Sequence, residues 1–168
     1  YVDNTNFSKN CHGYTHIVGE LAYEDFSAGK ELVVGKEVAY CTYGFFHGFM
    51  EILLQDTGTY DGAREFCDYI HSLLATTTRT VGPCLHGIGH GVTDASDPRH
   101  YGDPHKYIEK SLELCDEIGN TYYESKICAT GVFNALAGMY LADDYGTEAD
   151  YGLAVDTNDI YEPCRHYE

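Results

Sequence analysis

Apolar residues recur at helical spacing in several parts of the chain, and no long stretch alternates with period two. After Cys41, two apolar rows run at three- and four-residue intervals: Phe45, Phe49 and Ile52, and Phe46, Met50 and Leu53. The same spacing relates Ile108, Leu112, Cys115 and Ile118, and also Val132, Leu136 and Tyr140. Apolar residues three and four positions apart fall on one face of a helix. The pattern therefore predicts an all-α fold, despite many Tyr, Thr and Gly residues, which are weaker helix formers.

Four of the expected helices carry one short motif, which we call the S segment. It reads Cys, two residues, Gly, two residues, then His or Asn; the first copy has one residue between Cys and Gly. The copies start at Cys11, Cys41, Cys84 and Cys128, and we expect S segments near 11–20, 41–54, 84–94 and 128–142. A pattern that recurs along a chain is the signature of a repeat architecture.

A second motif, the F segment, precedes two of the S segments. Phe66-Cys67-Asp68-Tyr69-Ile70 matches Leu114-Cys115-Asp116-Glu117-Ile118, and Pro163-Cys164-Arg165-His166-Tyr167 is a weaker third copy. We expect F segments near 62–75, 106–119 and 159–168. An F segment, a short connector and an S segment make a helical hairpin. The sequence therefore predicts one domain over residues 1–168, a single compact array of repeated, disulfide-clamped helical hairpins.

The repeat also predicts which cysteines pair. Cys67 precedes Cys84 by 17 positions and Cys115 precedes Cys128 by 13, at the same places in two units. A disulfide that closes a loop of this size contributes about 3 kcal/mol in the chain-entropy description. Buried free thiols are the alternative, because they pack as small apolar side chains. No CxxC or CxxCH motif occurs, so zinc ribbons, thioredoxin-like sites and covalently attached haem are not indicated.

Cys11 and Cys164 lack partners in this scheme. Cys11 is an S-type cysteine without a preceding F segment, and Cys164 is an F-type cysteine without a following S segment. Joined head to tail, Cys164 of one chain and Cys11 of the next would be separated by an interval within the 13–17 positions seen inside the chain. This predicts an intersubunit disulfide in a filament or ring, with Cys41 left over. A chain cut from a longer array would show the same half units.

Charge and composition narrow the class of protein. The chain has 27 acidic against 10 basic residues, a net charge of −17, and contains 9 His and 7 Cys. Nucleic acids and anionic membrane surfaces require clustered cations, so neither is an expected partner. The apolar runs are too short for membrane insertion. Disulfides are typical of oxidising compartments, which predicts a secreted, extracellular or cell-surface protein, and Asn6-Phe7-Ser8 fits an N-glycosylation acceptor.

Histidines are the main candidates for chemistry. His12 and His16, and likewise His86 and His90, are four residues apart, and His47 occupies the corresponding position of another S segment. Histidines at this spacing share one helix face and can chelate one transition metal. Carboxylates follow at the same interval, as further ligands or as partners that orient an imidazole. The expected ligands are His12, His16, His47, His86 and His90, and the supporting carboxylates are Glu20, Glu51 and Asp94.

Three functions fit these residues. The first is an extracellular protein that binds copper, zinc or non-covalent haem, for metal handling or electron transfer. The second is a self-assembling subunit of a filament or surface layer, in which His and Gly serve packing. The third is a metal-dependent oxidase or hydrolase, which would need an open coordination position and a base from among the three carboxylates. The remaining histidines lie outside the repeat register and are expected in surface or core roles: His71, His100, His105 and His166.

Overall fold

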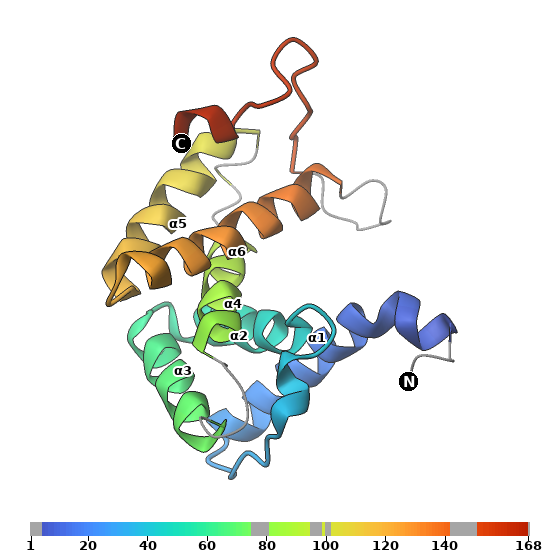
Figure 1. The fold of residues 1–168 in the computed structure, drawn as a ribbon, viewed down its shortest axis with the longest axis vertical. Coiled ribbons are helices and arrows are strands. Elements are labelled where there is room, and N and C mark those ends of the chain that lie inside the picture. Colours follow the sequence, from blue (N-terminus) through green and yellow to red (C-terminus); the bar gives the residue numbers. More distant parts are fainter. Residues whose placement is uncertain (1–4, 75–80, 95–98, 100–101, 142–150, 168) are drawn as a thin grey trace.

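The computed structural model describes residues 5–74, 81–94, 99, 102–141 and 151–167, with the side chains of 5–9 and of Asp94 left out. Its α-helices are α1 (Thr5–Ser27), α2 (Gly44–Thr57), α3 (Asp61–Leu74), α4 (Val81–Asp94), α5 (Pro104–Ile118) and α6 (Tyr122–Tyr140). Short 3₁₀ helices are η1 (Lys36–Ala39) and η3 (Cys164–Tyr167). The described residues contain no strand, so the predicted all-α class is confirmed (Figure 1).

The described helices can be compared with the expected S and F segments by position. The S segments overlap α1, α2, α4 and α6, with Cys41–Tyr43 preceding α2, and the first two F segments overlap α3 and α5. The third was expected over 159–168, and its described part, residues 159–167, contains only the 3₁₀ helix η3. Pro163 has no amide donor and disfavours the α conformation of the residue before it. Asp159 also holds a turn there, since its carboxylate accepts from the Tyr161 amide at 3.1 Å and from the Arg165 guanidinium at 2.8 Å.

The four helices that carry S segments pack in series, α1 on α2, α2 on α4 and α4 on α6. Glycines lie at each crossing. A side chain on Gly48 would meet the backbone carbonyl of His16, one on Gly87 the backbone of Phe46, and one on Gly131 the backbone carbonyl of His86. Helix backbones approach this closely only where a Cβ is missing. These contacts offset the cost of about 0.5–1 kcal/mol that each helical glycine carries relative to alanine.

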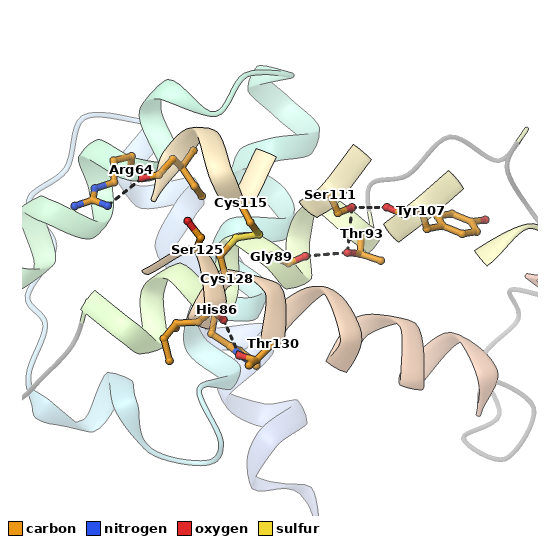
Figure 2. The surroundings of a disulfide bond; sticks show 12 residues. Arg64, His86, Gly89, Thr93, Tyr107, Ser111, Cys115, Ser125, Cys128 and Thr130 are labelled. Atoms are coloured by element: carbon orange, nitrogen blue, oxygen red, sulfur yellow. Dashed lines mark hydrogen bonds between the residues drawn. A yellow bond between two sulfur atoms is a disulfide. The ribbon is translucent and has the colours of Figure 1, made fainter. Parts of the chain in front are cut away.

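Three disulfides connect the described helices. Both predicted pairs are present: Cys67–Cys84 joins α3 to α4, and Cys115–Cys128 joins α5 to α6 (Figure 2). The third bond, Cys11–Cys41, joins α1 to the segment before α2, across a Cα–Cα distance of 5.5 Å. The expected link between Cys11 and Cys164 of a neighbouring chain is therefore wrong. Packing of α1 against the start of α2 brings Cys11 beside Cys41 and uses its thiol within the chain.

The apolar residues gather in two main regions and in a smaller cluster of Cys115, Cys128 and Val132 between α5 and α6. One lies among α1, α2, α3 and α4 and includes Phe46, Phe49, Phe66 and Leu85. The other lies between α5, α6 and the C-terminal segment, where Tyr151, Leu153 and Tyr167 pack on Ile108, Leu136 and Met139. A polar contact ties the two regions, because Arg64 of α3 donates to the Glu124 carboxylate at 2.7 Å and to the Ile118 carbonyl at 3.1 Å.

Membrane insertion was not expected from the sequence. Among the helices that the structure describes, none combines the length and the apolar character that a bilayer span requires.

Candidate metal sites

The five histidines of the S segments lie together where α1, α2 and α4 cross; we call this group the five-histidine centre. His12 and His16 come from α1, His47 from α2, and His86 and His90 from α4. The ring centroid of His47 lies 4.1 Å from that of His90, 5.0 Å from His12, 5.1 Å from His86 and 6.3 Å from His16. Four-residue spacing puts each pair on one helix face, and the glycine crossings bring the three faces together.

His47 is the most enclosed member of this centre. Its side chain is 0% exposed, and neither ring nitrogen forms a hydrogen bond with any residue that the structure describes. Its ring stacks on that of His90 with an interplanar angle of 12°. Burial lowers the pKa of His47 far below its usual value, and the neighbouring imidazoles, His90 foremost, lower it further. His47 is therefore neutral at physiological pH, the form in which imidazole binds metals.

His86 is oriented by side chains of α6. Its Nδ1 lies 2.8 Å from the hydroxyl of Thr130, and that hydroxyl donates to the Ile127 carbonyl at 2.6 Å (Figure 2). The hydrogen bond between Nδ1 and Thr130 fixes the orientation of the His86 ring. Burial lowers the pKa of His86 to about 4, with a contribution from His90, while a hydrogen bond with Asn134 acts in the opposite direction.

The tautomer is defined for one histidine of α1, His12, whereas His16 has a carboxylate beside each ring nitrogen. Nδ1 of His12 lies 3.0 Å from the Cys41 carbonyl, which can only accept, so this nitrogen carries the proton. Nδ1 of His16 lies 3.0 Å from the Glu20 carboxylate. For His12, the hydrogen bond at Nδ1 fixes the ring and leaves Nε2 as the metal-binding nitrogen, as in many metal-ligating histidines.

The carboxylates expected near the histidines have different positions. Glu20 orients His16, and the Glu51 carboxylate lies 3.3 Å from Nε2 of the same ring. Two ligands of a tetrahedral ion, each about 2.0–2.1 Å from the metal, lie about 3.3 Å apart. His16 and Glu51 thus have the spacing of two ligands of one ion. The side chain of Asp94 lies outside the described residues.

A second group of candidate ligands lies outside the five-histidine centre. His105, Glu162 and His166 are the one set among the described residues in which three ligand atoms all lie within 4.8 Å of one another. In the five-histidine centre the rings are close, but their nitrogens do not reach this mutual spacing, so side-chain rotation would precede binding of one ion by three of them.

From the sequence, His105 and His166 were expected in surface or core roles. The signal that points to them is the four-residue interval between Glu162 and His166, the same interval that identified the other histidine pairs. His105 is far away in sequence and carries no such signal. Of the other two histidines outside the register, His71 is exposed on α3, and His100 lies outside the described residues.

No protein-family model, curated protein or solved structure matches this chain.

Proposed function

We propose that the chain is an extracellular metal-binding protein whose five-histidine centre holds a transition-metal ion, zinc or copper. The observation that supports this most strongly is His47. A buried polar group without a hydrogen bond costs about 1–3 kcal/mol, and His47 has two such nitrogens among four other imidazoles. A metal ion would give one of these nitrogens a partner, and the neutral state of the ring favours its binding.

Packing alone does not account for these imidazoles. In α6 the S segment has Asn134 where α2 has His47, and Asn134 is exposed although α6 crosses α4 as closely as α2 crosses α1. The glycine contacts form the crossing in both places, whereas only one of them encloses an imidazole. The helices can therefore cross without a buried histidine, and the histidines at the first crossing have a chemical role in this proposal.

An ion suits this centre better than haem. A porphyrin is a flat macrocycle that needs a slot between its ligands, while the rings of His47 and His90 are stacked on each other at 4.1 Å. Imidazole nitrogens with one or two carboxylates are suitable ligands for zinc and copper. The oxidase or hydrolase alternative would use the same ligands with Glu51, beside His16, as the base.

The disulfides bear on the compartment of the protein, on its metal ligands and on the origin of its helices. Six cysteines are paired in disulfides, which is typical of secreted proteins and leaves imidazole as the main metal ligand. We also propose that the helices derive from a repeated F–S hairpin, since α3–α4 and α5–α6 are clamped by disulfides at corresponding places.

The experiment is a metal titration of chelator-treated protein with Zn²⁺ and Cu²⁺, monitored by competition with a chromophoric chelator. His47→Asn introduces the residue that the fourth S segment has at this position, so the fold should be kept. We expect this variant to bind the metal at the five-histidine centre at least tenfold more weakly than the natural protein. His71→Asn, an exposed histidine on α3, is the matched control and should bind normally.

Two results would contradict the proposal. One is an unchanged affinity of the His47→Asn variant while circular dichroism shows a native helical signal. The other is a Soret band on addition of haemin that disappears in the same variant, which would establish haem as the ligand.

A second candidate function is self-association, and it rests on the surface of α1. Four apolar side chains at helical spacing are 49–55% exposed there: Tyr14, Ile17, Val18 and Leu21. We propose that this stripe docks on a second copy of the chain. Because each copy carries a net charge of −17, association should strengthen with salt, which screens the repulsion.

Sedimentation velocity at low and high salt tests this second proposal. Ile17→Lys should shift the protein towards the monomer, while the control Val33→Lys changes an equally apolar residue that is exposed outside α1. A monomer at both salt concentrations, in the natural protein, would remove self-association through this stripe.

A further inference from the structure

We propose that His105, Glu162 and His166 form a second metal site, which binds a divalent transition-metal ion such as Zn²⁺ and fastens the C-terminal segment to α5. This site shares no residue with the five-histidine centre. It does not depend on the function proposed above, because a different set of contacts supports it.

The geometry joins two segments far apart in sequence. His105 lies in the first turn of α5, and Glu162 and His166 flank the start of η3, which lies at that end of α5 (Figure 1). Nε2 of His105 is 2.7 Å from one carboxylate oxygen of Glu162, and Nε2 of His166 is 3.1 Å from the other. The two rings meet edge to face, with centroids 4.9 Å apart. Three ligand atoms therefore converge without any rearrangement of the backbone.

The donor set indicates the class of ion. Two imidazole nitrogens and one carboxylate are a zinc ligand set that leaves a fourth position for water. Calcium and magnesium prefer oxygen ligands, so nitrogen donors favour a transition metal. Two further carboxylates, Glu109 and Asp103, lie close enough to act electrostatically on the neighbouring Tyr167, and Asp103 also pairs with Lys106 at 3.2 Å. This surrounding charge attracts a cation.

Tyr167 supports the ring of His105 from the other side. Its hydroxyl lies 2.9 Å from Nδ1 of His105. When Nε2 binds a metal, the imidazole proton resides on Nδ1, and the phenol oxygen can accept it. His105 thus has both a candidate metal-binding nitrogen and a partner that fixes its tautomer.

Metal at this site would strengthen an existing contact. Tyr151, Leu153 and Tyr167 of the C-terminal segment already pack on α5 and α6. Without metal, the segment is fastened to α5 at this point by hydrogen bonds of partly exposed side chains, which contribute little in water. An ion that binds only when the segment is docked stabilises the docked state by mass action.

Zinc stoichiometry of the full, chelator-treated chain tests the proposal. The natural protein should bind one equivalent that His105→Ala and His166→Ala each lose and that His47→Asn and the control His71→Ala keep. Glu162→Gln, which keeps a hydrogen-bonding oxygen, should weaken this equivalent at least tenfold. Amide hydrogen exchange over residues 159–167 should slow with zinc in the natural protein and remain unchanged by zinc in His105→Ala.

Each outcome separates this site from the five-histidine centre. If His47→Asn abolishes all zinc binding, or if His105→Ala and His166→Ala retain full stoichiometry with a native helical signal, the second site is overturned. If zinc is lost only in the His105 and His166 variants, this site stands and the five-histidine centre does not bind zinc.

Discussion

The crossing of α1 with α2 and the crossing of α4 with α6 have the same backbone contacts but different side-chain chemistry. Gly44 lies against the backbone carbonyl of His12, and Gly131, at the corresponding position, lies against that of His86. Three residues further on, α2 has the fully buried His47 and α6 has the exposed Asn134. Gly44 and Gly131 therefore allow the close crossing in both places. A buried imidazole follows the glycine in only one of them, at His47.

Position in the series of helices explains the difference in burial. Helix α2 packs between α1 and α4, so the side chain of His47 is enclosed by imidazoles from both neighbours. Helix α6 is the last S-segment helix in the series, and Asn134 forms a hydrogen bond with His86 at the edge of the group. The fourth segment thus contributes polar partners that orient a histidine of the third.

The largest expected effect concerns the glycines that both crossings share. Gly44→Ala and Gly131→Ala would each place a Cβ against a backbone carbonyl. We expect a loss of about 3 kcal/mol in the free energy of unfolding, at the upper end for overpacked sites. Chemical denaturation of the metal-free protein measures it.

Two other glycines serve as controls for this prediction. At Gly13 in α1 and Gly138 in α6, a Cβ would have no neighbouring atom within 4 Å, so alanine there should stabilise by about 0.5–1 kcal/mol. Equal effects at Gly131 and Gly138 would show that the close crossing does not determine stability.

A smaller effect per pH unit is expected from the titration of two histidines, His47 in the first crossing and His86 in the second. Both have a lowered pKa in the folded protein, so below pH 6.5 the unfolded chain binds protons that the folded chain does not. Stability of the metal-free protein should therefore fall as the pH falls, by up to about 1.4 kcal/mol per unit for a group that stays neutral. The contribution of His86 should end near its folded pKa of about 4.

Comparison with His47→Leu isolates the part that belongs to the first crossing. Between pH 6.5 and 5, the natural protein should lose about 1.5 kcal/mol more than this variant, measured by denaturation at each pH. Parallel pH profiles for the two proteins would mean that His47 is not held neutral by burial.

The smallest expected effect is the stability of the His47→Leu variant at pH 8 without metal. Removal of a buried imidazole that lacks hydrogen bonds should raise the free energy of unfolding by about 1 kcal/mol. Asn134→Leu, at the corresponding position of α6, should instead lower it by about 0.5–1 kcal/mol, because the hydrogen bond with His86 is lost. A destabilised His47→Leu variant would favour a packing role for His47.

Much of the fold could be predicted from local spacing. The apolar rows after Cys41 lie on the buried face of α2. The recurring cysteines form the disulfides between α3 and α4 and between α5 and α6. The pairing of Cys11 could not be derived in this way. It depends on where α1 lies relative to the segment before α2, a contact between residues 30 positions apart.

The sequence by itself determined the helices, two of the disulfides and the histidine pairs, because each depends on residues a few positions apart or on a repeated interval. Only the tertiary structure decided which faces meet. It enclosed His47 among four imidazoles, since glycines allow three helices to cross at backbone contact. It also brought His105 to Glu162 and His166, 57 or more positions away, because the C-terminal segment packs its apolar side chains on α5 and α6. The spacing of residues along the chain predicts which side chains lie on one face of a helix. Burial of apolar surface determines which helices pack against each other.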